Sequence, residues 1–204
     1  MDKQTVINAL YKNRILLMLC AVLIMGGVFG ISVLKIIPEN ICKNLFIMTS
    51  KTTENFLNEF LNKFSLSAVF LILIYSAGLS IIGKYTSVFF VFAYGIFNTF
   101  ARGLNYMFFG SQNFVNSVIS YFTSALYFGF MLIIMAENSF YSSLALNEAV
   151  KNNNAEKTRF KAKNITVKFI GFTAVFAIFS AFSAYISIVI QSVLWFFSLD
   201  VLRF

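Results

Sequence analysis

Side chains that commonly catalyse reactions or bind metals are scarce in this sequence. The 204-residue chain has no histidine, the most common general base and metal ligand. Its two cysteines, Cys20 and Cys42, fit no zinc-binding pattern, and we expect them to be unpaired thiols. No P-loop, H-E-x-x-H, C-x-x-C or G-x-S-x-G motif occurs. The sequence therefore predicts no catalytic site, no metal and no cofactor.

Charged side chains are also absent from the centres of the apolar runs. Asp, Glu, Lys and Arg make up 12% of the chain, about half the share that is usual in a soluble domain. Proton- and ion-coupled carriers often place a carboxylate in mid-membrane. Here Glu137 lies at the end of a run, where it reaches water. The composition thus weighs against a coupled transporter as well as an enzyme.

Hydroxyl and amide side chains are the polar groups that remain inside the runs. The run 114–136 carries several of them, and Ser117, Ser120 and Ser124 recur on one helical face. Such groups usually hydrogen-bond neighbouring helices in a membrane. The alternative is that they line a path for a substrate.

The elements that must position these groups are long apolar runs. A bilayer core about 30 Å thick needs roughly 20 apolar residues of helix. The runs cover residues 15–34, 65–83, 85–101, 114–136 and 169–199. Because the last is too long for one span, we expect it to cross over 169–191 and break near Gln191. The sequence predicts an all-α polytopic membrane bundle, with about five transmembrane helices in a single integral membrane domain.

Charge asymmetry predicts the orientation of this bundle. With the N-terminus in the cytoplasm, ten of the 16 Lys and Arg residues fall inside and six fall outside. Cytoplasmic loops carry the excess of Lys and Arg, so we expect the N-terminus inside and the C-terminus outside. The first run has a basic start like a secretory signal, but it is longer than a signal h-region and lacks an A-x-A site. We therefore expect a retained anchor.

The outer segment 35–64 predicts two short amphipathic helices after a break at Pro38. Phe56, Phe60 and Phe64 recur at helical spacing on one face of the second helix. Helices of this kind can lie on the membrane surface with the apolar face down. The alternative, compatible with the first, is that the three rings dock an extracytoplasmic partner.

The inner segment 137–168 is rich in basic residues. We expect an interfacial helix over 140–150 and a break at 152–154, where three asparagines follow one another. The basic flank after the break consists of Lys157, Arg159, Lys161 and Lys163. Attraction to anionic headgroups explains such a flank. Because the segment contains no nucleic-acid-binding module, we expect no nucleic acid as partner.

Two further expectations concern helix connections and packing. Lys84 alone separates the second and third runs, which predicts a tight hairpin there, and 103–113 reads as a short outer connection. In the last run, one face carries alanines and the opposite face carries Phe172, Phe176 and Phe179. Because small residues let membrane helices approach closely, we expect the alanine face to pack inward and the phenylalanine face to meet lipid. The alanines are Ala174, Ala177, Ala181 and Ala184.

The segment 71–103, LILIYSAGLSIIGKYTSVFFVFAYGIFNTFARG, resembles the core of the stage II sporulation protein M family. The family has a hydrophobic stretch, a Gly-x-Ser-Ile-Ile-Gly-like turn and an apolar span with glycines. Gly78, Ser80, Gly83 and Gly95 match this pattern. The chain departs from the pattern after Gly83, where the family often has proline, and at Thr99, where it often repeats glycine.

The resemblance implies a non-enzymatic scaffold, a multi-pass protein of the bacterial cytoplasmic membrane. Members of the family are similar in role to an anchor that gathers peptidoglycan-degrading partners, stage II sporulation proteins D and P, during engulfment. The partner contacts would then fall on the outer segment 35–64 or between the spans. The alternative function is a membrane subunit of a small-molecule transporter, driven by a separate ATPase that touches the inner segment.

Overall fold

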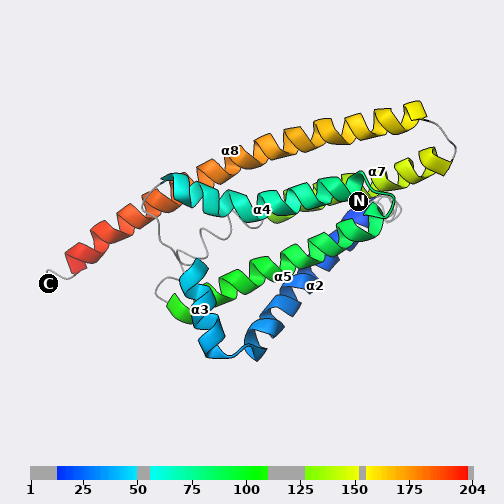
Figure 1. Ribbon diagram of the computed structural model, residues 1–204. Coiled ribbons are helices and arrows are strands. Elements are labelled where there is room, and N and C mark those ends of the chain that lie inside the picture. The colour runs from blue at the N-terminus through cyan, green and yellow to red at the C-terminus, as the bar shows by residue number, and fades with distance from the viewer. Residues whose placement is uncertain (1–12, 50–55, 110–126, 152–154, 202–204) are drawn as a thin grey trace, which may run out of the picture.

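The computed structural model describes residues 13–49, 56–109, 127–151 and 155–201, and within them the chain forms helices and no strands (Figure 1). The helices are α2 (Arg14–Ile36), α3 (Glu39–Thr49), α4 (Phe56–Gly78), α5 (Gly83–Phe109), α7 (Tyr127–Lys151) and α8 (Ala155–Val201).

Four segments of the described residues are long and apolar enough to cross a membrane. They are Arg14–Ile36, Gly83–Phe108, Tyr127–Lys151 and Lys163–Ile186. The apolar part of α4, Ser67–Gly78, is shorter than a span. The structure is therefore all-helical, and the length and apolar composition of these helices are compatible with a multi-pass membrane protein.

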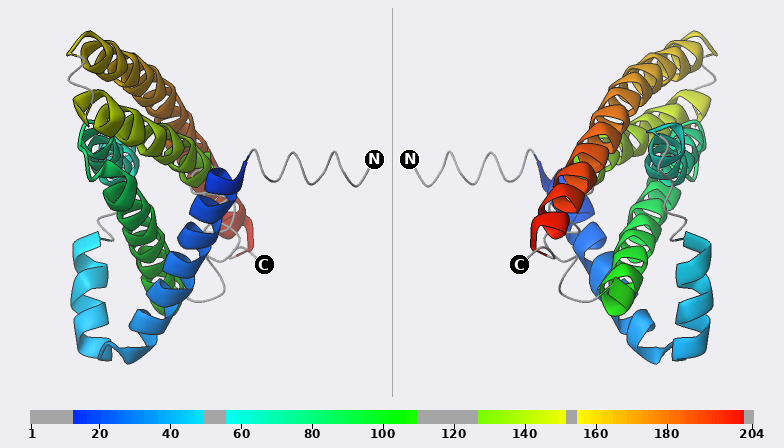
Figure 2. Two further views of the ribbon diagram at one scale, coloured as in Figure 1. Left: turned by 90° about the vertical axis from the view of Figure 1, so that its right-hand side faces the viewer. Right: turned by 90° about the vertical axis from the view of Figure 1, so that its left-hand side faces the viewer.

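The helices alternate in direction along the chain. Helices α2, α5 and α8 begin at the end of the molecule where α4 and α7 finish, on the right of Figure 1. We call this end the hairpin end, because the turn between α4 and α5 lies there. The opposite end carries α3, which packs against α5. In both views of Figure 2, α3 lies at the opposite edge of the molecule from the first half of α8.

Two apolar clusters hold the described helices together. The larger joins α2, α4, α5, α7 and α8 and contains Leu19, Ile74, Leu132 and Phe176. The smaller joins Leu34, Cys42 and Leu104 and fixes α3 on α2 and α5. Pro38 separates α2 from α3 as predicted, and Ile37 before it has the extended backbone that a following proline favours.

Several predicted boundaries were wrong because helices continue through polar positions. The hairpin does not turn at Lys84: α4 ends at Gly78 and α5 begins at Gly83. The short run 85–101 is part of a 27-residue helix that continues through most of the connection expected at 103–113. In a membrane helix, the backbone N–H and C=O groups are paired with each other regardless of the side chains. Isolated polar residues therefore do not end the helix.

The same continuity changes the loops and the last run. The second helix expected in 35–64 is the first part of α4, and the helix expected over 140–150 is the last part of α7. Helix α8 has no break near Gln191 and extends over 47 residues, about 70 Å at 1.5 Å per residue. Helix α7 ends at Lys151 and α8 begins at Ala155. Residues 152–154 and the first part of the run 114–136, with its serines, lie outside the described residues.

The predicted orientation of α8 was right at Ala184, which is buried, and at Phe179, which is 39% exposed, but wrong at Phe176 and Ala174. Phe176, expected to face lipid, is 2% exposed, whereas Ala174 is exposed. Ala177 and Ala181 are half-buried, and Ala184 is fully buried. Phe176 packs between Phe64 of α4 and Phe128 of α7, with ring centroids 5.4 and 4.2 Å away. A large ring fills the space between two other helices better than alanine does, and this packing decides the buried face.

Candidate functional site

The family-like motif at Gly78, Ser80 and Gly83 forms the turn between α4 and α5. The Ser80 N–H donates to the Ala77 carbonyl at 2.9 Å, and the Gly83 N–H donates to the Ser80 carbonyl at 3.1 Å. A side chain at Gly83 would collide with the Ala77 carbonyl, so only glycine fits this return of the chain.

A buried serine of α7 clasps this turn. The Ser143 hydroxyl donates to the Ser80 carbonyl at 2.8 Å, with the Ile81 carbonyl 3.2 Å away, and it accepts from the Lys84 N–H at 3.1 Å. One hydroxyl thus serves backbone groups on both sides of the turn. Ser143 is fully buried, where unpaired backbone groups would be costly.

A second buried serine, one turn earlier on α7, repeats this pattern. The Ser139 hydroxyl donates to the Ile74 carbonyl of α4. Gly78 lies directly beside it, and a Cβ at Gly78 would meet the Ser139 Oγ at 2.5 Å. We call Ser139, Ser143 and the turn 79–82 the serine clasp. Its chemistry is helix attachment, because both hydroxyls are engaged with backbone.

Helices α2 and α5 meet through small residues, in a contact that we call the glycine seam. A Cβ at Gly95 would lie 2.5 Å from the Leu23 carbonyl oxygen, and one at Gly30 would lie 2.7 Å from the Ile96 carbonyl oxygen. The Thr99 hydroxyl donates to the Gly95 carbonyl at 2.8 Å, which satisfies it within its own helix. Gly26 completes the seam, because a Cβ there would collide with the Phe92 carbonyl.

Half of the glycine seam was not predicted from the sequence. Gly95 and Thr99 belong to the segment that resembles the family, whereas Gly26 and Gly30 of α2 were not singled out. The signal was present, because a G-x-x-x-G pair in an apolar run of about 20 residues is a known contact motif of membrane helices.

Side chains of α8 attach to α4 and α7 near the hairpin end. The hydroxyls of Tyr75 and Thr166 are 3.0 Å apart, and the Tyr75 ring stacks on Phe169 with centroids 4.4 Å apart. Lys168 donates to the Asn138 side-chain carbonyl at 2.7 Å. These polar groups also serve helix contacts.

The three rings of the expected docking face do not share one environment. Phe56 is 42% exposed, Phe60 is half-buried, and Phe64 packs on Phe176. The rings stack in sequence, with centroids 6.4 Å apart for the first pair and 5.4 Å for the second. Leu57 and Leu61, 68% and 52% exposed, form the more open face of α4. Phe64 is therefore part of the helix packing rather than of an open surface.

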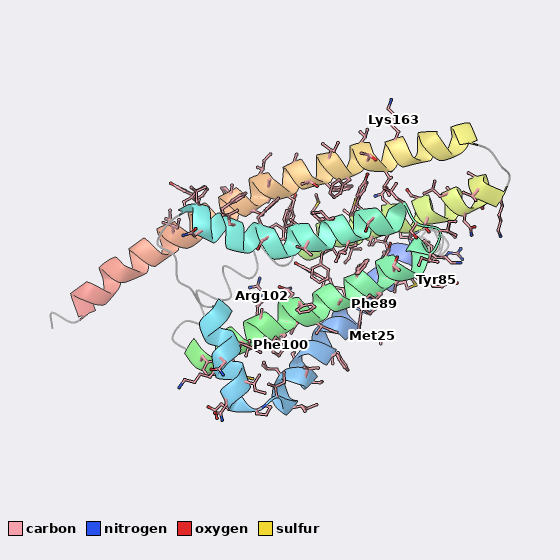
Figure 3. All side chains as sticks on the ribbon, viewed as in Figure 1. Met25, Tyr85, Phe89, Phe100, Arg102 and Lys163 are labelled. Carbon is pink, nitrogen blue, oxygen red and sulfur yellow. The ribbon has the colours of Figure 1, made fainter. Side chains whose placement is uncertain are left out.

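The basic flank lies in the first turns of α8. Lys163 is exposed at the hairpin end (Figure 3), and the side chains of Lys157, Arg159 and Lys161 lie outside the described part of the structure. Cys20 in α2 and Cys42 in α3 are free thiols. Among the described residues, no three His, Cys, Asp or Glu side chains come together as metal ligands.

Comparison of the chain with protein-family models, with curated proteins and with solved structures found no match.

Proposed function

We propose that the protein is a non-enzymatic scaffold subunit of a cell-envelope complex. The main support is that the polar groups of the serine clasp, and those by which α8 contacts α4 and α7, are engaged in contacts between helices. A scaffold needs a rigid frame with open surfaces, and this arrangement of groups suits that role better than catalysis. By the resemblance of segment 71–103, the partners are peptidoglycan-degrading enzymes similar to stage II sporulation proteins D and P.

We further propose that the chain crosses the bacterial cytoplasmic membrane five times, with α4 as the additional span. The alternating directions of α2, α4, α5, α7 and α8 support this count. Basic residues gather at the hairpin end: Arg14 begins α2, Lys84 lies in the first turn of α5, and Lys151 ends α7. Lys163 of α8 lies there too (Figure 3), and Lys168 bonds Asn138 of α7. Because cytoplasmic ends collect Lys and Arg, the hairpin end is cytoplasmic and α3 lies outside.

Capture of partners tests the scaffold directly. The full chain carries a C-terminal tag in its native membrane, is extracted in mild detergent, and the co-purified proteins are identified by mass spectrometry. Recovery of peptidoglycan hydrolases is the expected result. Substitution of Leu57 and Leu61 by serine, on the open face of α4, should reduce that recovery, while Ile178→Ser on α8 should leave it unchanged. A preparation that repeatedly yields no envelope partner argues against the scaffold.

One observation favours the transporter alternative. Ser143 lies at the level of the α4–α5 turn, so the last eight residues of α7, from Leu144 to Lys151, extend about 12 Å beyond it. With the start of α8, they form a protruding pair of helix ends (Figure 1). A cytoplasmic ATPase could dock on such a projection. Recovery of an ATPase pair in the same capture experiment would replace the scaffold with this function.

A further inference from the structure

An open apolar groove runs between α2 and α5 near the hairpin end. Its volume is about 360 Å³, and its walls are Val22, Met25, Tyr85, Val88, Phe89 and Phe92. Figure 3 shows Met25, Tyr85 and Phe89 along the line where the two helices run side by side. Met25, Tyr85 and Phe89 are each more than 60% exposed, so the groove faces outward from the bundle.

A basic group lies at the mouth of this groove. Lys84, in the first turn of α5, places its Nζ 4.6 Å from the centre of the Tyr85 ring, and Tyr85 is the groove residue closest to the hairpin end. Arg14 begins the neighbouring α2 at the same end and is exposed. Neither α2 nor α5 contains an Asp or Glu residue. The groove therefore combines apolar walls with a positively charged end.

We infer that this groove binds an anionic phospholipid, with one acyl chain between α2 and α5 and the phosphate at Lys84. From Tyr85 to Phe92 the groove follows eight residues of α5, which rise about 10 Å along the helix axis, and this length accommodates the upper part of an acyl chain. Basic pockets between transmembrane helices on the cytoplasmic side attract anionic headgroups. The phosphate enters beside the Lys84 ammonium while Tyr85 contacts the glycerol region, as aromatic residues do at the interface.

A second copy of the chain fits this groove less well. Two copies in one membrane have the same orientation, and a two-fold contact through this groove brings Lys84 and Arg14 of one copy toward those of the other. The like charges repel, whereas an anionic lipid neutralises them. The charge at the entrance thus selects the lipid as occupant.

Native mass spectrometry of the full chain tests this site. The purified protein is supplied with phosphatidylglycerol or phosphatidylcholine of identical acyl chains, and the retained lipid is counted. Lys84→Gln should lower the preference for phosphatidylglycerol about fivefold, because one basic residue contributes on the order of a fivefold difference near a surface. Lys151→Gln, at the same end but on α7 and exposed, is the matched control and should keep the preference.

The apolar part of the site is tested by filling the groove. Met25→Trp should reduce retention of both lipids, whereas Ile170→Trp, at an equally exposed position of α8, should not. Phe89→Ala, which removes a wall, provides a second variant should Met25→Trp fail to yield monodisperse protein. An unchanged lipid preference in Lys84→Gln overturns the inference. A change of oligomeric mass in Met25→Trp with unchanged lipid retention also overturns it, because the groove would then be a contact between copies.

Discussion

From the glycine seam we predict that adding a single methyl group at Gly95 would push α2 and α5 apart. In Gly95→Ala, the new Cβ would lie 2.5 Å from the Leu23 carbonyl oxygen, 3.1 Å from the Gly27 nitrogen and 3.2 Å from the Gly26 carbonyl carbon. All three atoms belong to the backbone of α2 and cannot rotate away. Carbon–oxygen contacts usually begin at about 3.3 Å, so the helices must move apart by about 0.8 Å or more.

The expected loss of stability follows from two opposing effects. Forcing an extra methyl group into a packed contact costs about 1–3 kcal/mol. Alanine is favoured over glycine within a helix by about 1 kcal/mol, which offsets part of that cost. Gly171 of α8 isolates the second effect, because a Cβ there would meet no atom within 4 Å. The difference between Gly95→Ala and Gly171→Ala should therefore be the packing cost alone.

Thermal melting in mild detergent measures this difference. Each kcal/mol lowers the melting temperature by about 2–4 °C in a chain of this size, so Gly95→Ala should melt roughly 2–12 °C below Gly171→Ala. Gly129→Ala should fall between them, because its Cβ would meet only the mobile end of Leu23, at 3.3 Å. Equal melting temperatures for Gly95→Ala and Gly171→Ala would refute the close approach of α2 and α5.

Three further outcomes are expected. Ser143→Ala should lower the free energy of unfolding by about 1–3 kcal/mol, because it leaves buried backbone groups unpaired; Ser32→Ala, whose exposed hydroxyl bonds only within its own helix, should change it by less than about 0.5 kcal/mol. Tyr75→Phe should cost about 0.5–1.5 kcal/mol in the same melts, since it loses one hydrogen bond and keeps its ring stack. On a cysteine-free background in intact cells, a membrane-impermeant maleimide should label Lys43→Cys but not Lys163→Cys, and the reverse pattern would invert the proposed topology.

The sequence was sufficient to predict the class of the protein and some of its breaks. Long apolar runs have few explanations other than membrane helices. Pro38 ends α2 because proline disfavours helix in the residue before it. The motif at Gly78 and Gly83 marked the hairpin, although its turn, residues 79–82, lies before Lys84 rather than at it. Signals that act on the backbone itself could therefore be found without a structure.

The buried faces could not be predicted in the same way. In water, apolar residues point inward, but lipid is as apolar as a protein core, so hydrophobicity does not distinguish the two sides of a membrane helix. The size of the side chains was therefore used to predict the buried face of α8, and Phe176 shows why this criterion is insufficient. Beside Phe176, the space between α4 and α7 is large enough for an aromatic ring. The size of this space depends on helices that are distant in the sequence. The partners of Ser139 and Ser143 depend on the same distant geometry.

Helix α5 joins the two kinds of contact described above. Its first residues, Gly83 and Lys84, are held by the serine clasp of α7, and Gly95 lies in the glycine seam with α2. Between them, Val91 and Tyr94 are buried in the larger cluster. The family-like residues thus join the α4–α5 turn to α7 through Gly78, Ser80 and Gly83, and join α5 to α2 through Gly95. A resemblance that rests on such residues bears on the fold more directly than on the function. Substitutions in them would destabilise the frame, so the scaffold role is better tested at exposed positions such as Leu57.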